Sequence, residues 1–116
     1  PMTPLRASIL AFSLFGLACT EPEAEGDPPA APTNLTAVQA GGGAHLTWED
    51  NSDNEDEFVV MRKDGSGDYQ EIAREVFDTE QYHDEPLTSG TSYTYKVVAV
   101  NADGESESNE ATFDAP

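Results

Sequence analysis

Few side chains in this 116-residue sequence have the type and spacing that catalysis or metal binding requires. The two histidines, His45 and His83, lie far apart in the sequence, and neither has a second histidine or a cysteine at the short spacing of a zinc site. Ser66 lies between two glycines but outside the Gly-x-Ser-x-Gly pattern of a hydrolase nucleophile. No glycine-rich phosphate-binding loop is present. We therefore predict no enzymatic activity, no metal site and no cofactor.

The densest group of possible ligands is the acidic segment 49–57. Oxygen-bearing side chains, which calcium prefers, occupy every second position in it: Asp50, Ser52, Asn54 and Asp56. An EF-hand loop counted from the first of these would need glycine at its sixth position and glutamate at its twelfth, but Glu55 and Met61 stand there. The segment is thus either a solvated loop between strands or a calcium-binding loop of another kind.

An apolar stripe is a candidate surface for contact with a partner. Alternation along two predicted strands directs four apolar side chains away from the core: Val59, Met61, Val98 and Val100. Such a stripe on the outside of an acidic protein indicates an interaction surface. The alternatives are ordinary scattered apolar residues, or packing of the stripe against a linker. The sequence does not identify the partner.

The charge balance excludes one class of partner. The chain has 23 Asp and Glu against 5 Lys and Arg, a formal net charge of −18. A protein that binds nucleic acid neutralises phosphates with clustered basic side chains, which this chain lacks. The same charge opposes electrostatic docking on anionic lipid. We expect no nucleic-acid binding and a soluble, monomeric domain.

Residues 1–18 differ from the rest of the chain. They contain one base, Arg6, no acid, and an apolar run from Ile9 to Ala18. A basic residue followed by such a run is typical of a secretory signal peptide. The run is shorter than the roughly 20 residues that a membrane-spanning helix needs. We predict a signal peptide over residues 1–18, with a buried helix as the alternative.

The single cysteine, Cys19, directly follows this run. Its context resembles the signal of bacterial lipoproteins, in which a small residue, here Ala18, precedes a cysteine that becomes the acylated N-terminus. That family prefers leucine three positions before the cysteine, where this chain has Gly16. The resemblance implies lipidation of Cys19 and a membrane anchor; a free cysteine is the alternative. In that family an aspartate after the cysteine marks retention in the inner membrane, so Thr20 at this position implies the outer membrane or cell surface of a bacterium.

Residues 19–31 have the composition of a linker. They are rich in proline and acid and contain no large apolar residue, so they cannot form a core of their own. We expect this segment to be solvated and partly extended, and at roughly 3.1 Å per residue it would hold a domain away from a membrane.

From residue 32 onward the sequence consists of short runs in which apolar and polar residues alternate, and no run has the periodicity of a helix. Turn-forming sequences separate the runs: Gly41-Gly42-Gly43, Asp50 to Asp56, Asp64-Gly65-Ser66-Gly67, Thr88-Ser89-Gly90 and Asp103-Gly104. Many short strands without helices indicate an antiparallel sandwich or barrel.

Over residues 32–115 these runs resemble the fibronectin type III domain. The likeness rests on the order of several short segments: Pro32-Thr33-Asn34-Leu35, Leu46-Thr47-Trp48, Phe58 to Arg62, Tyr82-His83-Asp84 and Ser108-Asn109-Glu110. The segment from Leu87 to Tyr93 resembles the tyrosine corner of such sandwiches, in which the tyrosine hydroxyl bonds to the upstream backbone. The family implies an all-β, immunoglobulin-like sandwich of seven strands. Its first, second and fifth strands form one sheet.

Alternation within the runs also identifies the side chains that should fill the sandwich. We expect them to be Leu35, Leu46, Trp48, Phe58, Val60, Tyr69, Ile72, Tyr82, Leu87, Tyr93, Tyr95, Val97, Ala99 and Phe113. The chain has one cysteine, so this core must stabilise the fold without an internal disulfide.

Together these features predict a non-enzymatic, lipid-anchored module at the bacterial cell surface that serves in protein binding, adhesion or spacing. A carbohydrate- or calcium-dependent binding domain is the alternative, and a small hydrolase is a more distant one.

Overall fold

The computed structural model describes residues 26–116, which form eight β-strands and no helix. The strands are β2 (Thr33–Ala40), β3 (Gly43–Glu49), β4 (Glu57–Asp64), β5 (Gln70–Val76), β6 (Gln81–Asp84), β7 (Ser92–Asn101), β8 (Gly104–Glu107) and β9 (Ala111–Asp114). The predicted signal peptide and residues 19–25 of the predicted linker lie outside the described residues.

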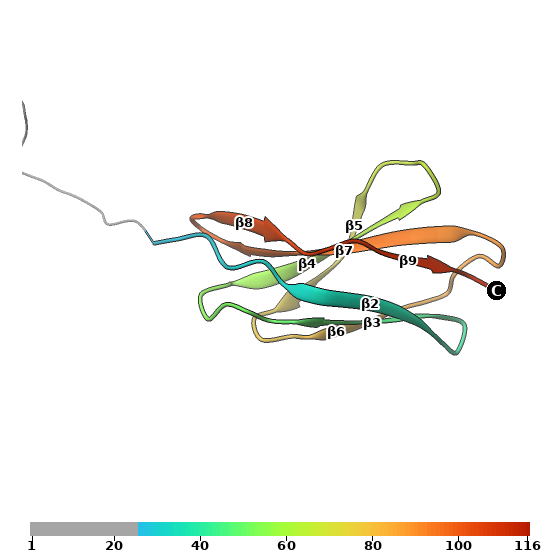
Figure 1. Ribbon diagram of the computed structural model, residues 1–116, viewed down its shortest axis with the longest axis horizontal. Coiled ribbons are helices and arrows are strands. Elements are labelled where there is room, and N and C mark those ends of the chain that lie inside the picture. Colours follow the sequence, from blue (N-terminus) through green and yellow to red (C-terminus); the bar gives the residue numbers. More distant parts are fainter. Residues whose placement is uncertain (1–25) are drawn as a thin grey trace, which may run out of the picture.

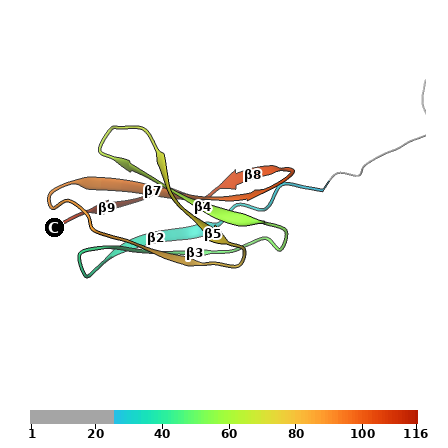
Figure 2. The same cartoon turned by 180° about the vertical axis from the view of Figure 1, so that it is seen from behind.

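The strands form two antiparallel sheets that lie face to face (Figure 1). One sheet has the order β2-β3-β6, and the other has the order β5-β4-β7-β8, with β9 also paired to β7. The hairpin of β4 and β5 projects away from the sandwich, as both views show (Figure 2). This arrangement confirms the predicted all-β, immunoglobulin-like sandwich.

The structure has one strand more than the seven expected because the last strand is interrupted. Ser108, Asn109 and Glu110 separate β8 from β9. At the break the Asn109 side chain accepts a hydrogen bond from the Leu35 amide (2.9 Å) and donates one to the Leu35 carbonyl (3.1 Å). The Asn109 side chain thus makes the two hydrogen bonds to Leu35 that the backbone of a neighbouring strand would make. It links β2 of the three-stranded sheet to the break between β8 and β9 of the five-stranded sheet.

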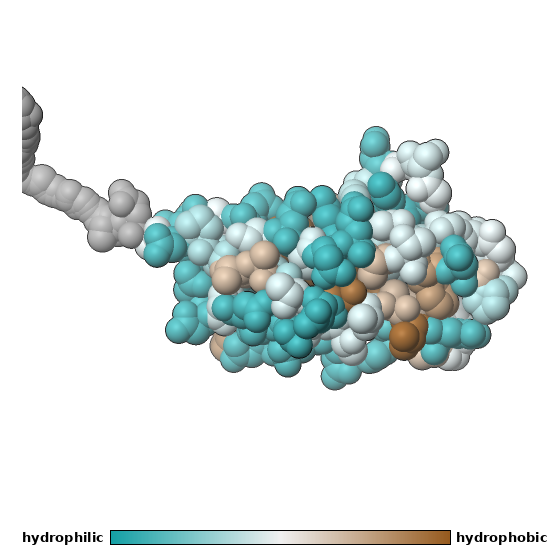
Figure 3. Space-filling view, viewed as in Figure 1, coloured by the Kyte–Doolittle hydropathy of each residue, from teal (hydrophilic) through white to brown (hydrophobic). Residues whose placement is uncertain are grey.

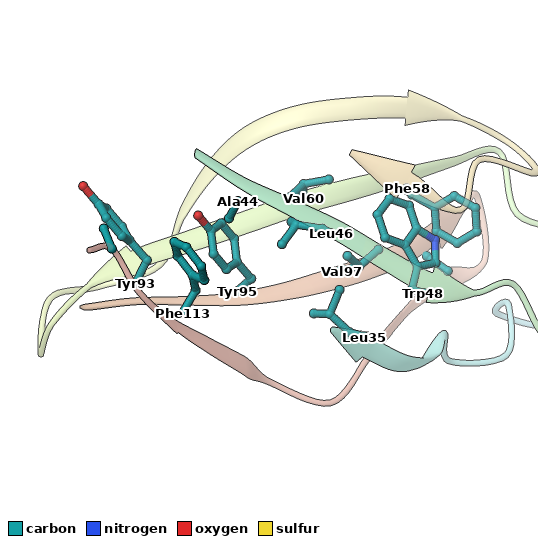
Figure 4. Close-up of a cluster of buried hydrophobic side chains, with 12 residues drawn as sticks. Leu35, Ala44, Leu46, Trp48, Phe58, Val60, Tyr93, Tyr95, Val97 and Phe113 are labelled. Atoms are coloured by element: carbon teal, nitrogen blue, oxygen red, sulfur yellow. The ribbon is translucent and has the colours of Figure 1, made fainter. Parts of the chain in front are cut away.

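The core lies between the sheets and contains most of the residues expected there (Figure 4). Trp48 and Phe58 come from opposite sheets and meet edge to face, with ring centres 5.8 Å apart. Ile72, Tyr82 and Leu87 are half-buried against this cluster. The remaining expected members are buried: Leu35, Leu46, Val60, Tyr93, Tyr95, Val97, Ala99 and Phe113.

Tyr69 was expected in the core, and that prediction is wrong. A bulge in β5 pairs Val60 with Ala73 but the next residue, Met61, with Glu71. The extra residue reverses the alternation that precedes it, so Tyr69 lies on the outer face of the sheet. There the ammonium nitrogens of Lys63 and Lys96 lie 4.9 Å and 4.4 Å from the centre of its ring.

The end of the predicted linker packs against the domain instead of extending into solvent. The Asp27 carbonyl accepts hydrogen bonds from Asn54 and Asn101, both at 3.0 Å. The Pro29 carbonyl accepts one from Ser106 (2.6 Å), and Pro29 itself is fully buried. These contacts were not apparent from composition, because the linker carbonyls bind side chains that are distant in the sequence.

The tyrosine corner is confirmed. The Thr88 amide donates a hydrogen bond of 2.9 Å to the Tyr93 hydroxyl oxygen. This contact closes the connection between β6 and β7 over the end of the core.

A buried polar group links the two sheets. Asp84, at the end of β6, is 6% exposed and points into the sandwich. Its carboxylate accepts hydrogen bonds from the Arg62 guanidinium on β4 (2.9 and 3.2 Å) and from the Tyr95 hydroxyl on β7 (2.7 Å). The Arg62 guanidinium also lies over the ring of Tyr93, 5.2 Å from its centre. The sheet that contains β6 is therefore fixed to two strands of the other sheet.

Protonation states support this contact. Burial and the adjacent Asp84 carboxylate both raise the pKa of Tyr95, so that its hydroxyl stays protonated and donates the hydrogen bond. Burial acts to lower the pKa of Arg62, but the bond to Asp84 outweighs it and raises that pKa overall. Arg62 therefore stays a cation and the Tyr95 hydroxyl stays a neutral donor across the neutral range.

We expect Trp48→Ala to lower the free energy of unfolding by about 3–5 kcal/mol, because it leaves a cavity beside Phe58. Trp48→Phe is the matched control: it keeps an aromatic ring and removes an indole N–H that has no hydrogen-bond partner among the described residues. Urea unfolding of the full chain measures both values. An alanine variant as stable as the wild type would show that Trp48 does not support the core.

We expect Asp84→Ala to cost about 3 kcal/mol, since it leaves a partly buried guanidinium without its partner. Tyr95→Phe removes one hydrogen bond and should cost only about 1 kcal/mol. Asp68→Asn, in the exposed turn between β4 and β5, should change stability by less than about 0.5 kcal/mol. Equal effects of Asp84→Ala and Asp68→Asn in thermal unfolding would contradict a cross-sheet role for Asp84.

Candidate functional site

The predicted lipidation site, Cys19, lies outside the described residues, so its modification stays a prediction. Within residues 26–116 no helix is long and apolar enough to cross a membrane. The described chain enters the domain beside β8, and the C-terminus lies at the opposite end of the sandwich (Figure 1).

The four residues of the predicted apolar stripe do lie on one face. Val59 of β4 pairs with Val98 of β7, and both point away from the core. Val59 and Val98 are nevertheless only 6% and 4% exposed, whereas Met61 and Val100 are half-buried. The stripe is therefore largely covered, and its role as a contact surface stays a prediction.

Long charged side chains flank the stripe. Arg74 is the cross-strand partner of Val59 and forms ion pairs with Glu57 (3.2 Å) and Glu71 (2.7 Å). Glu107 is the partner of Val98 and forms an ion pair with Lys96 (3.0 Å). The hydrocarbon stems of such side chains can cover apolar surface while their charged ends stay in water.

All four basic residues of the described chain belong to the five-stranded sheet. They are Arg62, Lys63, Arg74 and Lys96. Lys63 and Lys96 contact the ring of Tyr69, whose hydroxyl donates a hydrogen bond of 2.5 Å to Glu110. Burial and the Glu110 carboxylate raise the pKa of Tyr69, which keeps this hydroxyl protonated. Sequence reasoning missed this group because it placed Tyr69 in the core.

Exposed hydrophobic residues occur elsewhere, and they are few. The large ones are Val38 (56% exposed), Val76 (69%) and Phe77 (60%). The face in Figure 3 is mostly hydrophilic, with hydrophobic residues separated by polar ones. Val76, the last residue of β5, and Phe77, in the turn that follows, form the most exposed apolar pair of the described chain.

The acidic segment 49–57 folds around a small carboxylate cluster. Asp50, Glu55 and Asp78 place one carboxylate oxygen each within 4.8 Å of the others. Ser52 donates to Asp50 through its amide (3.0 Å) and to Glu55 through its hydroxyl (2.8 Å). The Asp78 amide donates to the second oxygen of Glu55 (3.0 Å). Asp78 comes from the β5–β6 connection, which is distant in the sequence, so its presence here was not predicted.

The two neighbouring carboxylates respond differently to this environment. Burial, together with the adjacent Glu55 carboxylate, raises the pKa of Asp50. Burial also acts to raise the pKa of Glu55, but the hydrogen bonds from Ser52 and from the Asp78 amide outweigh it and lower that pKa. The protein therefore stabilises the ionised form of Glu55, and it destabilises the ionised form of Asp50.

This cluster is a weak match to a calcium site. Calcium takes about six to eight oxygen ligands. The cluster offers three carboxylates, and both oxygens of Glu55 already accept hydrogen bonds from the protein. The arrangement is that of a loop stabilised by its own donors. Calcium binding by segment 49–57 stays an untested hypothesis.

The two histidines are brought together by strand pairing. His45 of β3 and His83 of β6 are direct cross-strand partners, and their ring centres are 6.0 Å apart. Both point away from the core, because each is followed or preceded on its strand by residues that point inward. Their proximity was not predicted, because the register between β3 and β6 is a tertiary property.

Two surface hollows of the described residues differ in their lining. One, of about 600 Å³, is lined by Thr47 and Trp48 of β3 and by residues 78–81. Another, of about 250 Å³, lies between the β2–β3 turn and the C-terminal residues and has no ionisable side chain in its lining.

Comparisons with known proteins agree with the fold. A family model described as the fibronectin type III domain matches residues 30–114. Among solved structures, an Fn3-like protein from Clostridium thermocellum is 35% identical with a TM-score of 0.63, and the match covers 76% of this chain and 94% of that one. A comparison with curated proteins finds no match.

Two further structures are similar in fold alone. The titin kinase with its flanking domains is 21% identical with a TM-score of 0.66, over 76% of this chain and 17% of that one. The pectate lyase PelI from Erwinia chrysanthemi, in complex with tetragalacturonic acid, is 24% identical with a TM-score of 0.65, over 72% of this chain and 28% of that one. This chain therefore corresponds to a small part of either protein.

We expect Asp50→Asn to raise the free energy of unfolding at pH 7 by about 0.5–1 kcal/mol, because it removes a like charge and keeps an oxygen for the Ser52 amide. Glu55→Gln should lower it by about 1–3 kcal/mol, because an amide cannot accept both hydrogen bonds. Urea unfolding at a series of pH values measures both differences.

The pH dependence has opposite signs at the two positions. The folded-state pKa of Asp50 is raised, so its ionisation destabilises the fold above that pKa and ceases to do so as the pH falls through it. The folded-state pKa of Glu55 is lowered, so its stabilisation is present above the unfolded pKa and is lost as the pH falls through the folded one. Both differences should shrink between pH 7 and about pH 3. A destabilising Asp50→Asn would contradict this account.

Proposed function

Since the chain belongs to the fibronectin type III family, we propose that it is a non-catalytic module at a bacterial cell surface, anchored by lipid on Cys19. There it acts in protein binding, adhesion or spacing. The observation that carries the non-catalytic part is the filled core: aromatic and aliphatic side chains from both sheets meet between them (Figure 4). Function in such a domain belongs to its surfaces and its two ends.

The position of the two ends supports a spacing role. The described chain begins beside β8 and ends beyond β9, at opposite ends of the sandwich (Figure 1). The first described residues are fixed to the domain by the hydrogen bonds of Asp27 and Pro29, so the domain is held at a defined point by the segment that follows Cys19. A module with this geometry keeps whatever is attached at its two ends apart by the length of the domain.

The surface chemistry supports protein binding over electrostatic docking on lipid. The net charge of −18 repels anionic headgroups, so attachment to a membrane would rest on acyl chains, each buried CH₂ contributing about 0.8 kcal/mol. The face around Tyr69 also carries the half-buried Met61, and tyrosine and methionine are both enriched at protein interfaces. The support for a carbohydrate-dependent role is the similarity in fold to the pectate lyase, at 24% identity.

We expect the full chain, produced in a bacterium that processes lipoproteins, to partition with the membrane and to begin at an acylated Cys19. Cys19→Ser removes the thiol that accepts the lipid and should move the protein to the soluble extracytoplasmic fraction. Intact-mass spectrometry of both fractions measures the mature N-terminus. An unmodified Cys19, or protein retained in the cytoplasm, would refute the anchor and leave the binding module to be tested by itself.

A further inference from the structure

The outer face of the three-stranded sheet carries two imidazoles side by side. His45 on β3 and His83 on β6 are paired in register, with ring centres 6.0 Å apart and ring planes inclined by 38°. His45 is half-buried, and the His83 side chain is 37% exposed, so both rings are accessible from solvent. These are the only histidines of the chain.

A carboxylate completes the group. Glu85 follows β6, and its Oε1 contacts Nε2 of His83. The Glu85 side chain is 49% exposed, so it too can be reached from solvent. A carboxylate in contact with an imidazole nitrogen fixes the orientation of the ring, and a carboxylate oxygen is itself a ligand for ions such as zinc.

We propose that His45, His83 and Glu85 form a binding site for a late first-row transition-metal ion, such as Cu²⁺, Ni²⁺ or Zn²⁺. Imidazole nitrogen is a preferred ligand of these ions. The ion takes the place of the proton between His83 Nε2 and Glu85 Oε1, and that proton is released to solvent. Two nitrogens and one oxygen then bind the ion, with water at the remaining positions.

Binding requires the side chains to rotate. With metal–nitrogen distances of about 2.0–2.1 Å and a tetrahedral angle, the two ring centres would lie roughly 5 Å apart. They are 6.0 Å apart in the structure, and the ligand atoms of His45, His83 and Glu85 do not all lie within 4.8 Å of one another. The proposal therefore includes rotation of these solvent-accessible side chains toward one ion.

The site is placed on a rigid frame. The residues on either side of the histidine pair are themselves cross-strand pairs, Ala44 with Asp84 and Leu46 with Tyr82, and their side chains point inward. The carboxylate of Asp84 is bound to Arg62 and Tyr95 of the other sheet, which fixes the strand that carries His83. Ligands held on strands are positioned more precisely than ligands on loops.

The site differs chemically from the cluster of Asp50, Glu55 and Asp78. That cluster offers oxygen only, as hard cations such as calcium prefer, whereas the histidine pair favours softer ions. The two sites can therefore be told apart by the ions that they bind. The acidic character of the domain raises the local concentration of any cation but does not select among them.

The test is isothermal titration of the full chain, produced without a histidine tag, with NiCl₂ and ZnCl₂. The chain carries Cys19→Ser, because a thiol would itself bind these ions. We expect one ion per chain and a thermal midpoint that rises by at least about 5 °C at saturation. His45→Gln and His83→Gln should each lower the affinity at least tenfold, and Glu85→Gln should lower it about tenfold.

Two further variants make the result decisive. Val38 pairs with His45 across β2 and is 56% exposed, so Val38→His adds a third imidazole and should raise the affinity. Asp68→Asn removes an acidic charge far from the site and should leave the affinity unchanged. Circular dichroism establishes that each variant is folded.

The proposal is overturned if the double variant His45→Gln/His83→Gln binds Ni²⁺ and Zn²⁺ as tightly as the parent chain. It is equally overturned if the parent chain gives no saturable heat with Ni²⁺, Zn²⁺ or Cu²⁺. Because neither outcome bears on Cys19, failure of this site and failure of the proposed lipid anchor are distinguishable.

Discussion

The buried carboxylate of Asp84 is the contact on which the relation between the two sheets depends. It receives a guanidinium from β4 and a hydroxyl from β7, so a short edge strand is fixed to the centre of the opposite sheet. A charge that is 6% exposed would be costly without these partners, and the fold is therefore constrained to keep them together. Since neighbours along a strand point to opposite faces, an inward Asp84 places His83 outward, directly opposite His45.

The same sandwich arrangement places apolar side chains in the interior of the domain and most of its ionisable groups on the surface. In the described residues the space between the sheets holds apolar side chains and the polar network of Asp84, Arg62 and Tyr95. Other polar groups of the described residues lie outside: a carboxylate cluster at one loop, the three other basic side chains of residues 26–116 on the five-stranded sheet, and two imidazoles on the three-stranded sheet. A module of this kind supplies a rigid support for surface groups, in keeping with a family whose members serve in binding or spacing.

Most of the fold could be predicted from local patterns, and the failures have physical causes. Alternation identified the strands and the core because an inward side chain every second residue is a property of each strand alone. Tyr69 was misplaced because a single bulge in β5 reverses the alternation before it. The packing of Asp27 and Pro29 was missed because their partners are distant in the sequence. The covering of Val59 and Val98 was missed because alternation gives the direction of a side chain and not what lies over it.

The sequence by itself determined the fold class, the core, the tyrosine corner and the absence of basic clusters, since these depend on residue type and spacing along the chain. It also defined the candidate lipidation site, which depends on a short contiguous segment. Only the tertiary structure decided which distant groups meet: Asp78 with Asp50 and Glu55, and His45 with His83. Strand register and the crossing between sheets set these contacts. No local pattern encodes them, because a pairing between two strands depends on both partners and on the core that holds them.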